Sequence, residues 1–343
     1  MTARRARLTA VGWETDLVIE SAADDPSPPA GSEIRVAVEA CGICYRDIID
    51  RDGRFPFIRI PITPGHEAAG RVIALGPDAK DFRVGDRVAS MHREFCGHCR
   101  ACASGSPSLC EFGASLFGLT IDGGYASELV APERAFYALP ATLPAPEAAI
   151  LHCTFGTAYR GLARLGELRS GGSVLVTGAN GGVGSAAVQV AKRLGAEVIA
   201  VVRNEKHVPH LMRLGADRVI VDAGAGFHKQ IAQPVDVALD CVGPPTFNSA
   251  LRSVRSGGTV VVVGNVATDR PELNLGYVVT RGVRICGSAG AARHDMAELL
   301  ELHARWPLSI CIQERLPLER ADYGQRRLRS GGLEGRLVID LAR

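Results

Sequence analysis

A glycine-rich turn between an expected strand and an expected helix constrains this chain most. Residues 174–177 form an apolar run of strand length, and Gly178, Gly181 and Gly184 follow it in the spacing G-x-x-G-x-x-G. Residues 185–194 then carry apolar side chains at helical spacing. Such a turn lets backbone N–H groups reach a pyrophosphate at the positive end of the helix, so the sequence predicts a dinucleotide site. The alternative is a glycine-rich turn without a ligand.

The rest of the middle region alternates between strand-length and helix-length patterns. Its further apolar runs of strand length are residues 198–202, 219–221, 235–240 and 260–264. This alternation favours a doubly wound parallel sheet, and therefore an α/β region. The first third instead has short strand patterns separated by Gly, Pro and Asp turns, at residues 35–39, 71–75 and 87–90. Such punctuation predicts a compact, mainly β unit.

Composition excludes several classes of protein. The 343 residues are 46% hydrophobic and 22% charged, which is typical of a globular chain with a large core. A net charge of +2 gives no reason to expect nucleic acid or an acidic membrane as a partner. No apolar run approaches the ~18 residues of a membrane helix, and residues 1–8 lack the apolar region of a secretory signal. We therefore expect a cytoplasmic protein, whose ten cysteines serve a metal or catalysis rather than disulfides.

Four of these cysteines lie within fifteen residues. Cys96, Cys99, Cys102 and Cys110 have the spacing C-x2-C-x2-C-x7-C. Four thiolates this close in sequence can converge on one tetrahedral ion, which suits a structural zinc. An iron–sulfur cluster or four unrelated buried thiols are the alternatives.

A second set of metal-binding residue types is scattered along the chain. Cys41 and Cys44 lie upstream, His66 and Glu67 are adjacent, and Cys153 lies far downstream. The C-x-x-C pair could be a redox motif, but it lies outside any βαβ pattern. Two sulfur atoms, one imidazole and one open position would make a catalytic zinc site.

Together these motifs resemble the zinc-containing, alcohol dehydrogenase branch of the medium-chain dehydrogenase/reductase superfamily. The similarity covers essentially the whole chain, including the G-I-C-x-x-D box at residues 42–47, the G-H-E-x-x-G box at 65–70 and F-x-V-G-D-R-V at 82–88. The resemblance implies two zinc ions per chain. Cys44, His66 and Cys153 would hold the catalytic zinc, with Glu67 as its neighbour or transient ligand. Asp47 would lie just outside the ligands, Cys41 would not be a ligand, and the four-cysteine set would hold the structural zinc.

The resemblance also implies the domain organisation. Residues 1–154 would form a GroES-like, β-rich catalytic domain whose structural-zinc lobe spans about residues 92–112. Residues 155–287 would form an inserted Rossmann domain that binds NADP, and residues 288–343 would return to the catalytic domain. The fold class is thus α/β plus β, and we expect a homodimer or homotetramer.

The cofactor contacts follow from the turn and from the ends of the strands. The predicted contacts are Thr157, Gly178, Gly181, Gly182, Val183, Gly184, Arg203, Cys241, Gly243, Gly264 and Asn265. Val202 stands where an acid would bind the ribose 2′-hydroxyl of NAD, and Arg203 follows it. A guanidinium can pair with a 2′-phosphate, so NADPH is the favoured cofactor. An exposed arginine on a loop is the alternative.

One position departs from the alcohol dehydrogenase pattern. The second residue after the first zinc cysteine is usually Ser or Thr, whose hydroxyl relays a proton, but here it is Arg46. Either water carries the proton, or this enzyme does not need the relay. Short boxes at residues 44–47, 263–266, 274–277 and 285–289 are also similar to the acryloyl-coenzyme A reductase subgroup.

We therefore expect hydride transfer from NADPH to a zinc-polarised small-molecule or CoA-ester substrate. An α,β-unsaturated carbonyl or CoA thioester is the favoured substrate class. A zinc-dependent alcohol dehydrogenase, or aldehyde or ketone reductase, is the first alternative, and a non-catalytic binding protein on the same fold is the second.

Overall fold

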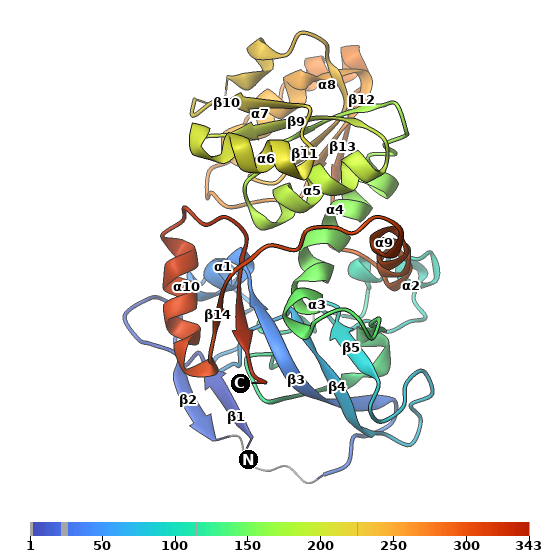
Figure 1. Cartoon of the computed structure of the whole chain (residues 1–343), viewed down its shortest axis with the longest axis vertical. Helices are drawn as coiled ribbons and strands as arrows, with labels where there is room; N and C mark the ends of the chain where they lie inside the picture. The colour runs from blue at the N-terminus through green and yellow to red at the C-terminus, as the bar shows by residue number, and fades with distance from the viewer. Residues whose placement is uncertain (1–2, 22–26, 114, 225, 343) are drawn as a thin grey trace. The chain divides into compact units, whose positions relative to one another are not determined.

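The computed structural model describes residues 3–21, 27–113, 115–224 and 226–342. Residues 1 and 2, which belong to the segment expected to lack a secretory signal, lie outside that description. The chain divides into two compact units. The first is Met1–Cys153 together with Cys311–Arg343, and the second is Thr154–Ile310 (Figure 1).

The first unit is built on a seven-stranded sheet centred on a long strand, β3 (Glu33–Ile43). Side chains along β3 alternate between buried and half-buried before the strand becomes fully buried at its carboxyl end. It pairs antiparallel with β4 (Ala68–Leu75) and with the C-terminal strand β15 (Arg336–Asp340), so the two ends of the chain meet in one sheet. This topology brings the carboxyl end of β3 beside residues near the C-terminus.

The other elements of this unit are short. The strands are β1 (Arg4–Arg7), β2 (Val18–Ser21), β5 (Arg87–Ser90), β6 (Glu128–Pro132), β7 (Phe136–Ala138) and β14 (Ile312–Leu316). The helices are α1 (Tyr45–Arg51), α2 (Arg100–Ala103), α3 (Ala145–Leu151) and α10 (Ala321–Arg329). Helix α3 packs against β3 and β4 and continues into a π-helical turn, His152–Gly156.

The second unit is a six-stranded parallel sheet in the order β10-β9-β8-β11-β12-β13. Its strands are β8 (Ser173–Val176), β9 (Glu197–Val202), β10 (Arg218–Val221), β11 (Val235–Asp240), β12 (Val254–Val262) and β13 (Arg284–Gly287). Its helices are α4 (Thr157–Tyr159), α5 (Gly182–Arg193), α6 (Val208–Leu214), α7 (Pro244–Ser253), α8 (Leu275–Arg281) and α9 (Arg293–Arg305). In chain order this is the 3-2-1-4-5-6 arrangement of a dinucleotide-binding sheet, which confirms the predicted fold class.

The C-terminal segment differs from the prediction. We placed its return to the first unit at residue 288, but in the structure it returns at Cys311. Helix α9 stays with the second unit, because its buried Asp295 pairs with Arg160 at 2.9 Å and Arg164 at 3.2 Å. Helix α10 and strand β14 were not predicted, since short and strongly charged segments carry a weak apolar pattern.

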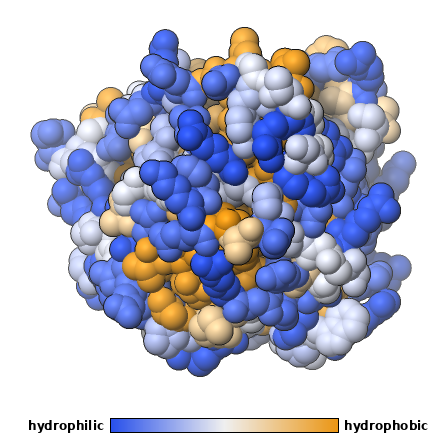
Figure 2. All heavy atoms as spheres, turned by 90° about the horizontal axis from the view of Figure 1, so that it is seen from above, coloured by the Kyte–Doolittle hydropathy of each residue, from blue (hydrophilic) through white to orange (hydrophobic). Residues whose placement is uncertain are grey.

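In the part of the chain that the structure describes, no helix has the length and apolar character needed to cross a bilayer. The face seen in Figure 2 is largely hydrophilic, and its apolar side chains gather in separate patches.

Candidate active site

Four predicted site residues converge in the first unit. Cys44 caps the start of α1, His66 and Glu67 directly precede β4, and Cys153 lies in the π-helical turn after α3. Their ligand atoms all lie within 4.8 Å of one another, and the two sulfur atoms are 3.8 Å apart. A tetrahedral zinc with bonds of about 2.3 Å would separate two sulfurs by about 3.8 Å. The cluster therefore has the spacing of a zinc site.

The orientation of His66 also fits a metal. Its Nδ1 lies 3.2 Å from Asp47 Oδ1, and its buried Nε2 has no hydrogen-bond partner among the described residues. A buried ring nitrogen without a partner is costly unless an ion occupies the space beside it. A carboxylate behind the ring is the usual way to orient an imidazole ligand.

Of the two thiols, Cys44 has electrostatics that favour a metal in the same place, whereas the hydrogen bond with Cys44 and burial raise the pKa of Cys153 well above its usual value. Hydrogen bonding from Cys153 and the nearby charge of His66 lower the pKa of Cys44 well below its usual value, although burial opposes the shift. The thiolate is the form that binds metals. Two sulfurs and one imidazole with Glu67 alongside match the donor set of a catalytic zinc, so these residues could hold that ion.

Asp47 connects the cluster to a buried tyrosine. Its Oδ2 accepts hydrogen bonds from the Cys44 backbone N–H at 2.9 Å and from the Tyr125 hydroxyl at 2.8 Å. Tyr125 is fully buried and precedes β6. Both Asp47 oxygens are thus committed, one to the ring of His66 and one to these donors. Tyr125 was not predicted from the sequence, because a single aromatic residue after two glycines carries no separate signal.

Glu67 is paired with an arginine from the end of the chain. Arg336, the first residue of β15, donates to Glu67 Oε2 at 2.5 Å and to the Ile43 carbonyl at 2.9 Å. Burial raises the pKa of Glu67 to about 7 even though Arg336 pulls it down. Arg336 was not predicted from the sequence either. The available signal was a charged residue directly before the apolar run 337–339.

Arg46 lies on α1 next to this cluster. Its Nε is 3.2 Å from the Asp50 carboxylate, and its Nη2 donates to the Phe117 carbonyl. The side chain keeps 19% of its surface exposed. Burial acts to lower the pKa of Arg46, but the charges of Asp50 and Asp47, and then of Cys44 and Cys153, raise it above its usual value. The guanidinium is thus a fixed cation close to the candidate metal ligands.

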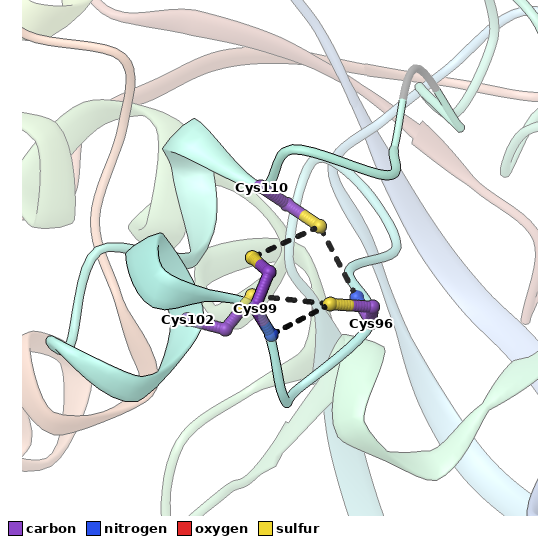
Figure 3. Close-up of side chains that lie close together, drawn as sticks. All are labelled: Cys96, Cys99, Cys102 and Cys110. Carbon is purple, nitrogen blue, oxygen red and sulfur yellow. Dashed lines mark hydrogen bonds between the residues drawn. The ribbon is translucent and has the colours of Figure 1, made fainter.

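The four remaining predicted ligands form a separate lobe, shown in Figure 3. The sulfurs of Cys96, Cys99, Cys102 and Cys110 lie within 4.8 Å of one another, with two of the separations at 3.9 and 4.0 Å. Backbone N–H groups of Cys96 and Cys99 point at sulfur atoms of the set at 3.3 and 3.2 Å. Donors of this kind stabilise thiolates, so the lobe fits a closed four-sulfur zinc site.

In the second unit, the glycine-rich turn joins β8 to α5. Gly178 has a φ of +56°, and a Cβ on Gly184 would lie 2.3 Å from the Gly178 carbonyl oxygen. Only glycine fits both positions, which keeps the turn tight at the N-terminus of a twelve-residue helix. Gly181 is the N-cap of that helix, and Gly182 and Val183 open it. The geometry suits a pyrophosphate.

The ends of the neighbouring strands lie at the same edge of the sheet. A Cβ on Gly264 would lie 2.0 Å from the Cys241 carbonyl oxygen, and one on Gly243 would approach both Gly264 and Asn265. The buried Asp240 ends β11 at this edge, where the sequence places the end of the fourth strand. It organises this edge by accepting hydrogen bonds from Thr177 and Thr246 at 2.6 Å and from the Gly243 N–H at 3.2 Å.

The remaining predicted cofactor residues are distributed around the turn. Arg203 is exposed and follows β9, which ends at the buried Val202. His207 Nε2 lies 3.5 Å from the Asn180 amide, so this histidine is next to the glycine-rich turn. Thr157 is buried in α4, which packs against α5.

A β-rich unit with two cysteine clusters, joined in one chain to a parallel dinucleotide-binding sheet, defines the class of zinc-type oxidoreductases. Comparison with known families agrees. The alcohol dehydrogenase GroES-like domain matches residues 30–141, and the zinc-binding dehydrogenase family matches residues 182–305.

Individual relatives span nearly the whole chain. The acryloyl-coenzyme A reductase of Sulfurisphaera tokodaii is 34% identical, covering 92% of this chain and 94% of the relative. An alcohol dehydrogenase of Geobacillus stearothermophilus is 33% identical, covering 90% and 91%. The crystal structure of AibC superposes with a TM-score of 0.91 at 38% identity, covering 99% of this chain and 96% of that one.

The chain belongs to the zinc-containing medium-chain dehydrogenase/reductase superfamily. It is an oxidoreductase, and its family implies zinc and a nicotinamide cofactor.

Proposed function

We propose that this oxidoreductase uses NADPH to reduce the activated C=C bond of an α,β-unsaturated carbonyl compound or CoA thioester. The proposal depends mainly on the identity and position of Arg46. This residue replaces the hydroxyl relay of an alcohol dehydrogenase with a cation held by Asp50 and the Phe117 carbonyl beside the cysteine–histidine cluster. Two relatives at 34% identity, both named acryloyl-coenzyme A reductase, support the same substrate class.

Each residue of the cluster would have a separate role in this reaction. When bound, zinc supplies a Lewis acid and the nicotinamide a hydride. Cys44, His66 and Cys153 would hold the metal, and Asp47 keeps the His66 ring in its orientation. When hydride adds to the β-carbon of the substrate, the π-electron pair moves toward the carbonyl oxygen, and a proton then adds to the α-carbon. The Arg46 cation would stabilise the negative charge that develops on that oxygen.

The second candidate is an alcohol dehydrogenase or aldehyde reductase. The complete set of Cys44, His66 and Cys153 beside Glu67 favours it, as does the Geobacillus relative named alcohol dehydrogenase. A non-catalytic binding protein would have no need for this buried ligand set. It is the weakest of the three alternatives.

One assay separates these functions. Purified protein is incubated with NADPH and crotonyl-CoA or acryloyl-CoA, and in parallel with simple aldehydes, while the nicotinamide absorbance is followed. Oxidation of NADPH with the enoyl thioesters supports the proposal. Oxidation with aldehydes alone identifies the second candidate, and no oxidation with any substrate favours a binding protein.

The choice of NADPH depends on Arg203. Val202 supplies no carboxylate to repel a 2′-phosphate, and the exposed Arg203 could pair with that phosphate. A charged hydrogen bond contributes about 1.5–3 kcal/mol, so Arg203→Ala should lower kcat/KM for NADPH roughly ten- to a hundredfold and leave NADH nearly unchanged. Arg252→Ala, which removes an exposed arginine of α7, is the matched control. An Arg203→Ala enzyme that keeps its NADPH preference would point to Lys206 or His207 instead.

We also propose that the chain forms a homodimer or homotetramer. Helix α8 exposes 67% of Leu275 and 77% of Val279, and the neighbouring edge strand β13 exposes 38% of Ile285. Apolar side chains this exposed are better covered by another copy than by water. Light scattering of the purified protein gives the mass directly, and a monomer at micromolar concentration contradicts this proposal.

A further inference from the structure

Asp50 is a buried acid with an incomplete set of partners. It lies on α1, is 3% exposed, and its Oδ2 is 3.2 Å from Arg46 Nε. Neither of its carboxylate oxygens has a hydrogen bond within the described part of the chain. Burial raises the pKa of Asp50 to about 7, although Arg46 acts against the shift. The protein thus keeps a carboxylate where its charged form is poorly stabilised.

A second buried acid–arginine pair shows what a stabilising arrangement looks like. Asp295 in α9 is fully buried and accepts hydrogen bonds from the Ala292 N–H at 2.8 Å, Arg160 at 2.9 Å and Arg164 at 3.2 Å. The pKa of Asp295 is lowered, because these donors outweigh the effect of burial. The same two residue types therefore form one satisfied pair and one unsatisfied pair.

A poorly satisfied buried ion pair contributes little to stability and often less than an apolar replacement. The pair of Arg46 and Asp50 therefore contributes little to stability. The geometry of Arg46 indicates another role for it. Asp50 lies 3.2 Å from Nε as an ion-pair partner without a hydrogen bond, and the Phe117 carbonyl accepts from Nη2, so each of these two nitrogen atoms has a defined neighbour. Nη1 has no hydrogen bond to any described residue, and the side chain reaches solvent with 19% of its surface.

The sequence and the helix place Arg46 beside the candidate metal ligands. It is the second residue of α1, two positions after the N-cap residue Cys44. A fixed donor next to the metal ligands can bind an oxygen atom that gains negative charge during the reaction.

We propose that Asp50 is a positioning residue that fixes the Arg46 guanidinium, so that Nη1 forms a binding site for the carbonyl oxygen of the substrate. This inference rests on the proposed function for its substrate class. It goes further by assigning a role to Asp50 and by treating the pair as one unit. Asp50 itself does not touch the substrate, and its effect passes through the orientation of Arg46.

The test compares Asp50→Asn with Asp295→Asn. Wild type and both variants are assayed for kcat and KM with NADPH and the substrate that wild type reduces, crotonyl-CoA in the first instance. Melting temperature and zinc content are measured on the same preparations. For Asp50→Asn we expect kcat to fall about tenfold with KM within about twofold and unchanged zinc, and a lower melting temperature because Arg46 loses its counter-charge. For Asp295→Asn we expect a lower melting temperature and an unchanged kcat.

A double-mutant cycle shows whether Asp50 acts through Arg46. Arg46→Gln should lower kcat more than Asp50→Asn does, and adding Asp50→Asn to Arg46→Gln should lower it no further. Independent effects of the two substitutions would overturn the positioning role. A lower melting temperature for Asp50→Asn with an unchanged kcat would also overturn it, because that is the behaviour of a structural pair. The double variant leaves no unpaired charge at this position, so it keeps the test open if one single variant folds poorly.

The outcomes also distinguish this inference from the proposed function. Wild type that reduces aldehydes but not crotonyl-CoA overturns the proposed function alone. The variants are then assayed with the aldehyde, whose carbonyl oxygen also gains negative charge, and the same fall in kcat supports the role of Asp50. Wild type that reduces neither substrate overturns both.

Discussion

The two cysteine clusters of the first unit have similar sulfur separations but are built from different parts of the chain. The lobe at residues 96–110 takes all four sulfurs from one short segment, and backbone N–H groups of that segment support them. The second cluster takes its ligands from three elements, and Asp47, Tyr125 and Arg336 surround it. The first arrangement can do little except hold an ion. The second surrounds its candidate ion with charged and hydrogen-bonding groups that can tune chemistry.

The largest effect expected from this difference is on activity. Cys153→Ser removes a ligand from the second cluster, so zinc should fall from two ions per chain to one and kcat by about 10³-fold, with the fold kept. Elemental analysis, kcat and circular dichroism measure the three quantities. Cys41→Ala is the control, because Cys41 is a buried thiol of the same region that lies outside the cluster.

Zinc analysis could show that the two clusters do not both bind a metal. One zinc per chain in wild type, unchanged by Cys153→Ser, would mean that the second cluster holds no metal. A loss of activity in Cys41→Ala equal to that in Cys153→Ser would instead revive the redox interpretation of the C-x-x-C pair.

The two clusters also differ in how well they could be predicted from the sequence, because one comes from a single segment and the other from three. The lobe could be predicted from spacing alone, because its four ligands lie within fifteen residues. The ligands of the second cluster were assigned through family resemblance, since Cys44 and Cys153 are separated by more than a hundred residues. The contacts of Tyr125 with Asp47 and of Arg336 with Glu67 could not be predicted, because they depend on which strands lie side by side. The parallel sheet was predictable from its apolar periodicity, whereas the return point at Cys311 depends on buried ion pairs of α9.

The second effect is on stability and should appear at the lobe. A closed zinc site contributes its binding free energy to folding, so Cys99→Ser should lower the free energy of unfolding on the order of 5 kcal/mol, a fraction of the ~10–16 kcal/mol seen in isolated zinc fingers. Protein that remains folded should keep most of its kcat. Chemical denaturation measures the loss, and His98→Ala, which changes the neighbouring exposed side chain, serves as the control. A Cys99→Ser variant with normal stability and two zinc ions would contradict the assignment of the lobe.

A smaller effect is expected on the zinc affinity of the second cluster, because only this cluster has Asp47 and Tyr125 behind its histidine ligand. Tyr125→Phe removes the hydroxyl that donates to Asp47, which loosens the carboxylate behind His66. Changes of this kind cost roughly 10–100-fold in metal affinity. One zinc should therefore be lost to a chelator at lower concentration, while the lobe keeps its ion. Tyr137→Phe is a matched control, because the buried Tyr137 hydroxyl has no hydrogen-bond partner among the described residues. Equal zinc retention in the two variants would show that Tyr125 does not support the cluster.

The smallest effect concerns the reaction type. Arg46→Ser restores the hydroxyl that an alcohol dehydrogenase has at this position and removes the cation held by Asp50. A hydroxyl relay assists alcohol oxidation, while loss of the cation weakens stabilisation of the carbonyl oxygen during enoyl reduction. The ratio of alcohol oxidation to crotonyl-CoA reduction should therefore rise by at least about tenfold, with zinc content unchanged. Both activities are measured on one preparation, so that differences in active fraction cancel. If the two rates move together, Arg46 does not determine the reaction type and the alcohol dehydrogenase alternative gains support. If the ratio rises, the second cluster differs from the lobe in a further respect, because Arg46 beside its ligands determines whether the enzyme favours enoyl reduction or alcohol oxidation.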